Sequence, residues 1–179
     1  MKKNFSLLII LFAFYAVNAQ NETNPYEKNN EIKVNVLTPL WQSFQVTYER
    51  HLNHNSSLGL SFYYVFDNTK NEIDLNYSIS PYYRRYFGRK KASGWFVEGF
   101  GMLTSIDGKK IYASEDHSIY TENPDVIDFA LGAGGGWKWV SKSGFLFEAN
   151  IGCGGLLFNA NKTDHTIVSK FGLSAGYRF

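Results

Sequence analysis

Apolar and polar side chains alternate along most of the chain, and the alternation is most regular in its last segment. From residue 167 to residue 179 the odd positions are mainly apolar and the even positions mainly small or charged, ending in Tyr177, Arg178 and Phe179. A period of two is the side-chain period of a β-strand with one apolar and one polar face. The same pattern predicts strands at about 31–38, 43–52, 57–67, 74–87, 94–106, 126–140, 144–158 and 165–179.

Turn-forming residues separate these segments, and no segment shows the apolar period of a helix. Polar, glycine-containing or asparagine-containing stretches lie at 53–56, 88–91 and 141–144, where chain reversals are expected. Tyr, Phe, Trp, Val and Ile, which strands prefer, are abundant in the segments between them. An even number of long antiparallel strands predicts an all-β fold, an eight-stranded antiparallel up-and-down transmembrane β-barrel.

The connections between the predicted strands alternate in length, which suggests an orientation. If the first strand rises from the periplasm, the periplasmic turns are 53–56, 88–93 and 141–143, and the outer loops are 39–42, 68–73, 107–125 and 159–164. Short turns on one side and longer loops on the other are typical of outer-membrane barrels. The first outer loop is short and departs from this trend. The third, 107–125, is the only long irregular segment and is expected to carry any surface contact.

Periodicity alone does not say which face lies inside, because a secreted lipocalin-like barrel places apolar residues inward and a membrane barrel places them outward. The polar face of segment 126–140 carries mostly alanine and glycine between Asp128 and Lys138. A soluble surface normally carries many more long charged side chains. This sparse face therefore suits a narrow lumen, and the membrane barrel is favoured. Interfacial aromatic girdles would then include Trp41, Phe87, Trp95, Trp139, Phe145 and Tyr177.

Seven charged residues on the inward faces lie near the predicted periplasmic strand ends: Lys33, Glu49, Arg84, Glu98, Lys138, Glu148 and Arg178. Charges inside a narrow barrel are tolerated only when they are paired and hydrogen-bonded. We therefore expect an interlocked ion-pair layer that closes this half of the lumen. An eight-stranded barrel is about filled by its own side chains, so a diffusion pore is not expected. A proton or ion pathway through the same charges is the functional alternative.

The beginning of the chain predicts export. Lys2 and Lys3 precede an apolar run from Phe5 to Val17, which is followed by small residues up to Ala19. This arrangement is typical of a cleaved signal peptide over residues 1–19, and the run is too short for a transmembrane helix. A polar segment, 20–30, would then lead into the barrel at 31–179.

Removal of residues 1–19 also changes the charge of the chain. Of 18 Lys and Arg residues, Lys2 and Lys3 are lost, which leaves 16 basic residues against 16 acidic ones. Nothing in this neutral mature chain indicates a nucleic acid partner. The single cysteine, Cys153, excludes an internal disulfide and is interpreted as a small apolar side chain.

Four segments carry a resemblance to a known family: Val34–Pro39, Phe44–Arg50, Ile79–Phe87 and Gly94–Gly99. They resemble a family of small uncharacterised outer-membrane barrels from Bacteroidota, and the similarity spans most of the mature chain. The resemblance implies the outer-membrane barrel fold, but it supplies no reaction and no catalytic residues.

An enzymatic role is the alternative, because some small outer-membrane barrels modify lipid A with Ser, His and an acid. His54 lies in a predicted periplasmic turn, and His51 is interpreted as a lumen residue beside Glu49. His117 and His165 lie on the outer side and would form a site only if two loops met. Their acidic neighbours lack diagnostic metal spacing, so no metal, cofactor or catalytic residue is predicted.

The sequence thus predicts a non-enzymatic barrel of the cell outer membrane with a packed polar lumen. Its role is expected to be structural or surface-interactive. Its expected partners are outer-membrane lipid and the barrel-assembly machinery, which would recognise Tyr177 and Phe179 at the chain end. A monomer is expected, and any extracellular partner is unknown.

Overall fold

The computed structural model describes residue 24 and residues 27–66, 75–112, 120–163 and 165–179, without the side chains of 110–122. The segment 1–19, predicted as a signal peptide, lies outside the described residues. Among the described residues, no helix is long and apolar enough to cross a membrane.

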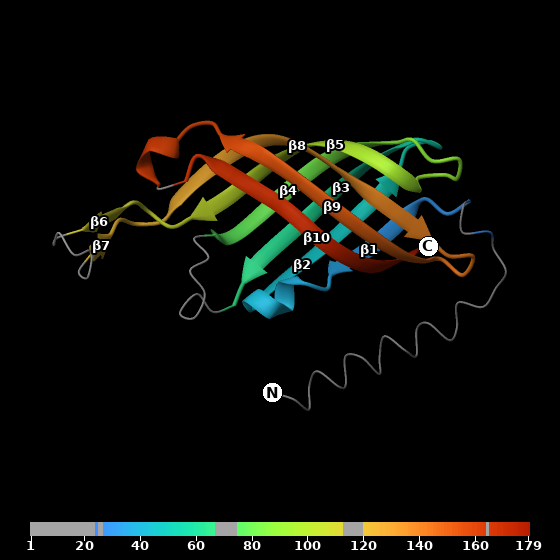
Figure 1. Cartoon of the computed structure of the whole chain (residues 1–179), viewed down its shortest axis with the longest axis horizontal. Helices are drawn as coiled ribbons and strands as arrows, with labels where there is room; N and C mark the ends of the chain where they lie inside the picture. The colour runs from blue at the N-terminus through green and yellow to red at the C-terminus, as the bar shows by residue number, and fades with distance from the viewer. Residues whose placement is uncertain (1–23, 25–26, 67–74, 113–119, 164) are drawn as a thin grey trace, which may run out of the picture.

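Eight antiparallel strands form a closed barrel, as Figure 1 shows. In chain order they are β1 (Asn30–Asn35), β2 (Ser43–His51), β3 (Ser56–Val65), β4 (Leu75–Tyr86), β5 (Gly94–Ile106), β8 (Val126–Val140), β9 (Phe145–Leu156) and β10 (Ile167–Arg178). Each strand pairs with its neighbours in the chain, and β1 pairs with β10 to close the sheet. The predicted eight-stranded up-and-down barrel is therefore confirmed, with strand ends that differ from the prediction by a few residues.

The two ends of the barrel differ in the length of their connections, which are mostly short at the turn end and mostly longer at the loop end. At the turn end, the short connections 52–55, 87–93 and 141–144 join consecutive strands. β1 begins and β10 ends at the same side. At the loop end lie the connections 36–42, 66–74, 107–125 and 157–166. At the turn end, Gly94, the first residue of β5, and Gly144, directly before β9, have positive φ angles of 88° and 93°. Glycine adopts such angles without steric cost.

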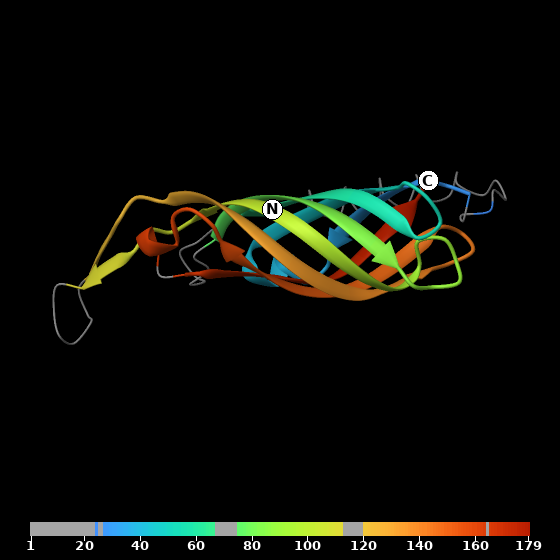
Figure 2. The ribbon, with the colours of Figure 1, turned by 90° about the horizontal axis from the view of Figure 1, so that it is seen from above.

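The segment 107–125 is not wholly irregular, contrary to the sequence-based expectation. It contains a two-stranded hairpin, β6 (Lys110–Tyr112) with β7 (Tyr120–Glu122), that projects beyond the barrel in Figure 2. Two 3₁₀ turns, η1 (Thr38–Trp41) and η2 (Ala160–Lys162), also lie at the loop end. Pro39 occupies the first turn of η1, where its fixed φ angle and missing N–H are tolerated, and β1 stops before it.

The outer face of the barrel is apolar and the inner face carries the charges. Exposed side chains include Leu58, Leu60 and Phe62 on β3, and Phe145, Phe147 and Ile151 on β9. All seven inward charges predicted from the sequence are buried. This polarity is the reverse of a soluble barrel, in which the apolar residues fill the interior.

The inside of the barrel has two layers of different character. The half near the turn end holds the buried charges, whereas the half near the loop end holds an apolar cluster: Tyr82, Phe100, Met102, Ile106, Ala130 and Val168, with Leu75 and Leu156 packed against it. The expectation of a packed polar lumen is correct near the turn end, whereas near the loop end the apolar cluster lies among buried polar side chains such as Ser78, Thr104 and Asp128. The alternation along β5 does not reveal this, because its inward and outward positions are both rich in apolar residues.

Candidate functional site

Glu49, near the end of β2, is the centre of the buried charges. Its two carboxylate oxygens accept hydrogen bonds from six side chains on β1, β3, β4 and β8: Lys33 (2.6 Å), Ser57 (2.7 Å), Tyr82 (2.9 Å), Arg84 (3.1 Å), Tyr86 (2.5 Å) and Lys138 (2.9 Å). A carboxylate offers about four lone-pair sites, so Glu49 is fully satisfied. One side chain thereby links β2 to four other strands of the barrel.

Arg84, on β4, reaches across the lumen to the other carboxylates. Its Nε donates to Glu98 at 2.6 Å, and its Nη1 donates to Glu148 at 2.7 Å. The guanidinium also lies over the rings of Tyr82 and Phe96, at 4.4 and 4.1 Å from their centroids. Stacking on aromatic faces together with a fixed fork of donors is a property of arginine that lysine would not reproduce.

Glu31 joins this layer, although the sequence analysis did not single it out. It is fully buried at the start of β1 and receives Lys138 Nζ at 2.7 Å. Arg178, on β10, donates to it from Nε and Nη2 and also donates to the backbone carbonyls of Lys91 and Ala92. Glu31 lies two residues before Lys33 on the same strand face, so the alternation that identified Lys33 could have found it.

Lys170, on β10, is a second member that the sequence analysis omitted. It starts nearer the loop end than the other charges, and its Nζ extends to Glu98 Oε1 at 2.6 Å. Its ammonium lies 4.4 Å from the ring centroid of Tyr82 and 5.1 Å from that of Phe100. The structure therefore brings together all seven predicted residues and adds Glu31 and Lys170. We call these nine residues the charged layer.

The charged layer fills the lumen near the turn end. Its lysine, arginine and glutamate side chains are at most 6% exposed, and every one makes an ion pair in which nitrogen and oxygen are within 4.0 Å. Removal of such groups from water is costly, and only good pairing geometry compensates the loss of hydration. The arrangement is therefore suited to closing and fixing the barrel.

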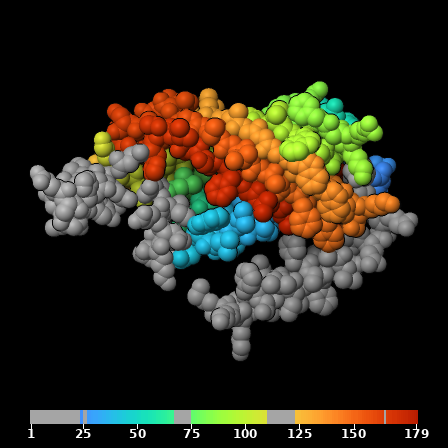
Figure 3. All heavy atoms as spheres, viewed as in Figure 1, coloured from blue at the N-terminus to red at the C-terminus, as the bar shows by residue number. Residues whose placement is uncertain are grey.

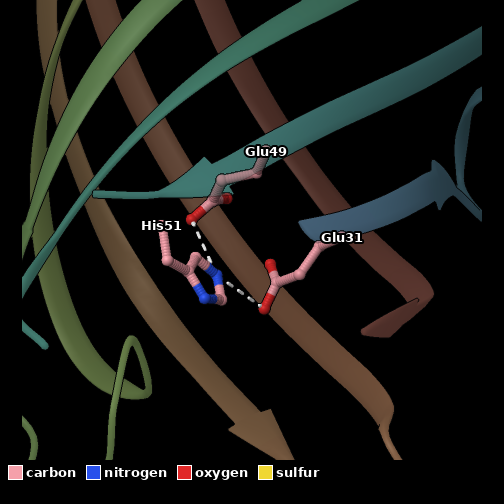
Figure 4. Close-up of side chains that lie close together, drawn as sticks. All are labelled: Glu31, Glu49 and His51. Atoms are coloured by element: carbon pink, nitrogen blue, oxygen red, sulfur yellow. Dashed lines mark ion pairs between the residues drawn. The ribbon is translucent and has the colours of Figure 1, made fainter. Parts of the chain in front are cut away.

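One cluster in the charged half of the lumen brings metal-ligating atom types close together. His51, Glu31 and Glu49 place potential ligand atoms within 4.8 Å of one another. Figure 4 shows the two carboxylates pointing toward the His51 ring. His51 Nε2 lies 3.1 Å from Glu31, and neither ring nitrogen of His51 has a well-aligned hydrogen bond. Lys138 and Arg178, however, already bind Glu31, and the charged layer contains five basic groups against four carboxylates. A divalent cation would add to an existing positive excess, so these residues do not fit a metal.

The histidines considered for catalysis are not brought together. His54 lies in the turn 52–55, with Nδ1 2.5 Å from Asn55 Oδ1. His165 lies at the opposite end, where its backbone N–H donates to Thr163 Oγ1. His117 lies outside the described residues. In the described parts of the chain, no Ser–His–acid arrangement links these residues.

Backbone hydrogen bonds join Phe179 to Asn30, the first residue of β1. Phe179 N donates to Asn30 O at 2.8 Å, and Asn30 N donates to Phe179 O at 3.1 Å. The Phe179 side chain is half exposed on the outside of the barrel. Tyr177 packs edge-on against Phe145, with ring centroids 5.5 Å apart. The terminal aromatic ring thus remains accessible although its backbone belongs to the closing strand pair.

Two solved outer-membrane barrels illustrate what the fold is similar to. The N-terminal β-barrel domain of Pseudomonas aeruginosa OprF matches with a TM-score of 0.57 and 15% identity, covering 85% of this chain and 98% of that one. Ail, the attachment invasion locus protein of Yersinia pestis, matches with a TM-score of 0.44 and 14% identity, covering 85% of this chain and 99% of that one. At this identity, the likeness to OprF establishes the fold and nothing further.

The sequence itself matches a family model over residues 5–178. That family is described as protein of unknown function, DUF3575. No curated protein matches the sequence.

Proposed function

This chain belongs to the DUF3575 family of proteins of unknown function, and on that premise we propose that it is a non-enzymatic barrel of the cell outer membrane, sealed inside by its charged layer. Its role is structural or surface-interactive. The observation that carries this proposal is the polarity of the barrel, with apolar side chains around the outside and ion pairs inside.

The outer face supports contact with lipid rather than water. Ile151 on β9 is 73% exposed, and Trp95 at the start of β5 is 69% exposed. Contiguous exposed apolar surface on this scale is rare in monomeric soluble proteins. A closed barrel also satisfies its backbone hydrogen bonds between strands, as a hydrocarbon environment requires.

The charged layer supports a sealed barrel rather than a pore. Arg84 contacts carboxylates from β2, β5 and β9, so its side chain lies across the lumen. Planar-bilayer recordings test this part of the proposal. We expect no open, long-lived channels from the folded protein, whereas a stable ohmic conductance would favour an ion pathway.

Several finer assignments belong to the same proposal. Residues 1–19 act as a signal peptide, the turn end faces the periplasm, and the barrel-assembly machinery recognises Tyr177 and Phe179. The protein is monomeric. It is of Bacteroidota origin, as the motif resemblance implies. The projecting β6–β7 hairpin would then be the element that contacts an extracellular partner.

Membrane fractionation combined with heat-modifiable gel migration tests the location and the fold together. We expect the processed protein in the outer-membrane fraction, with unheated samples migrating differently from boiled ones. A protein recovered as a soluble periplasmic species would contradict the proposal and favour a secreted ligand-binding barrel. An unchanged lipid A mass profile after gene deletion is expected as well, because the described residues show no catalytic arrangement; a changed profile would favour a lipid A-modifying enzyme.

A further inference from the structure

The barrel wall is incomplete at one place near the loop end. β10 pairs with β9 from Ile167 to Tyr177, but its register with β1 covers only Ser174 to Arg178. One further backbone hydrogen bond, from Val36 N to Leu173 O, continues this pairing before the chain turns into η1. In the described part of the chain, residues 167–170 of β10 therefore have no strand partner on this side.

A cavity of about 420 Å³ lies at this gap. Its lining includes Val168 and Lys170, which face the lumen, together with Ile167, Ser169 and Phe171, which face outward. A cavity that touches both faces of one strand passes around that strand's edge. Figure 3 shows the surface hollowed between the red atoms of β10 and the light-blue atoms of η1 and β2, with green atoms visible behind. The cavity is thus open sideways through the wall.

The mouth of this cavity is apolar on the outside. Ile167 and Phe171 on β10 line the cavity and are 64% and 51% exposed. Trp41 meets Phe171 edge-on, with ring centroids 5.6 Å apart, and forms one lip of the opening. Inside, Leu75, Met102, Ile106 and Val168 continue the apolar surface. A hydrocarbon chain would therefore find apolar side chains from the outer face to the interior.

The floor of the cavity is polar and carries a positive charge. Asn35 Nδ2 donates to Gln45 Oε1 at 2.8 Å and to Phe171 O at 3.3 Å. The second hydrogen bond connects the end of β1, just before η1, to the exposed edge of β10. Lys170 lies beside them and pairs with Glu98 alone among the described carboxylates. An ammonium has three donors, and among the described residues Lys170 forms one hydrogen bond, to Glu98.

The charge balance favours an anion at this position. The charged layer has five basic groups and four carboxylates, and Glu98 is shared between Lys170 and Arg84. Asp128, the remaining buried carboxylate of the described residues, does not line the cavity and accepts hydrogen bonds from the backbone N–H groups of Phe129, Phe158 and Asn159. Among the described residues the charged layer therefore has one basic group more than it has carboxylates, and Lys170 is its member that lines the cavity.

We propose that this cavity binds a single-chain acyl anion of the fatty-acid class, with its carboxylate at Lys170 and its chain along Met102, Ile106 and Val168 toward the lateral mouth. The volume lies in the lower part of the range of small-molecule pockets, about 300–1,000 Å³, which suits one chain rather than a whole two-chain lipid. Entry of the ligand from surrounding lipid through the lateral mouth rests on the proposed membrane location. The assignment of the ligand as an acyl anion does not.

Photo-crosslinking locates the ligand. The full-length folded protein in phospholipid nanodiscs is exposed to a diazirine-bearing long-chain fatty acid, and labelled peptides are mapped by mass spectrometry. We expect labelling to concentrate in the peptides that contain Met102 and Val168. Val168→Trp, which fills the cavity, should abolish this labelling, and Val97→Trp, on the outer face, should retain it. Labelling spread evenly over outward residues and unchanged by Val168→Trp would overturn the proposal.

A second pair of variants tests the charge. Lys170→Met should weaken binding of the fatty acid about tenfold or more, because it removes a charge-assisted hydrogen bond. It should leave the affinity for the fatty alcohol of equal length within about twofold, and Lys142→Met at the turn end should change neither. Equal binding of acid and alcohol to the wild-type protein would overturn the assignment of the carboxylate to Lys170. A phospholipid that competes as well as the fatty acid would overturn the single-chain assignment.

Heat-modifiable migration of each sample separates these outcomes from a failure of the proposed function. A variant that migrates as a folded barrel and lacks labelling supports the cavity. Because Lys170→Met leaves the cavity volume nearly unchanged, it keeps the proposal testable if Val168→Trp does not fold. A wild-type barrel that inserts normally but binds no acyl anion would overturn this inference and leave the membrane location standing.

Discussion

Arg178 and Glu31 face each other across the strand pair that closes the barrel. They are direct partners in the β1–β10 register, and Nε and Nη2 of Arg178 donate to Glu31 Oε1 at 2.8 and 2.6 Å. Both side chains are completely buried. The last strand is thus tied to the first by a charge pair as well as by its backbone.

A double-mutant cycle with Glu31→Gln and Arg178→Met tests this closure. Each single change leaves a buried charge without its partner, for which we expect a loss of about 3–5 kcal/mol in the free energy of unfolding. The double variant should lose clearly less than the sum. Urea unfolding in lipid vesicles measures these values, with Lys142→Met in the turn 141–144 as a control expected within about 0.5 kcal/mol of wild type. Additive losses would contradict a direct pair.

The outward face of β9 provides a test of the lipid contact. Ile151→Lys should lower the stability of the membrane-inserted barrel by about 2–4 kcal/mol if this position lies near the bilayer midplane. Ile151→Leu serves as the control and should be close to neutral. Unfolding from vesicles and the amount in the outer-membrane fraction are both measured. A lysine at residue 151 without effect would indicate that this face meets water.

Two glycines differ in the space around them and form a matched pair. A methyl group on Gly59 would collide with the ring of Tyr82, whereas a methyl group on Gly99 would meet nothing within 4 Å. Gly59→Ala should therefore cost about 1–3 kcal/mol, as is usual for overpacking, and should disturb the hydrogen bond from Tyr82 to Glu49. Gly99→Ala should stay within about 0.5 kcal/mol of wild type. Equal effects in urea unfolding would mean that Tyr82 can move aside.

The terminal residue allows assembly to be separated from stability. Phe179→Ala removes a half-exposed side chain but keeps the backbone hydrogen bonds to Asn30. We expect a reduced amount of folded protein in the outer membrane of cells and nearly unchanged folding of purified protein into lipid vesicles. Phe171→Ala, on the same face of β10, is the control for loss of an outward aromatic. Equal losses in both assays would assign Phe179 a structural role instead.

The sequence allows the strands and their faces to be predicted because a period of two is a local property. Leu58 and Leu60 point outward, and Glu49 and Arg84 point inward, as their positions in the alternation require. Glu31 was not predicted as a member of the charged layer because it lies near the start of its strand, directly after a polar segment. Lys170 was not predicted because its backbone lies nearer the loop end than the other charges, and only its long side chain reaches Glu98.

Features that depend on how strands are staggered could not be predicted. The gap beside Ile167 arises because β1 is much shorter than β10 and pairs only with its last part. No pattern within either strand encodes that offset. The β6–β7 hairpin was missed for a different reason, since three-residue strands are too short to show a period.

The position of Glu49 has a consequence for how the chain acquires its structure. Its hydrogen-bond donors lie between 8 and 89 residues away in the sequence, and the pair between Arg178 and Glu31 spans 147 residues. Such distant contacts stabilise the protein only after the chain between them has lost its conformational entropy. An incomplete barrel would also hold unpaired charges in an apolar environment. Folding should therefore be strongly cooperative, with few stable partial sheets. A chain shortened by its last strand would lose its whole interior rather than one eighth of it.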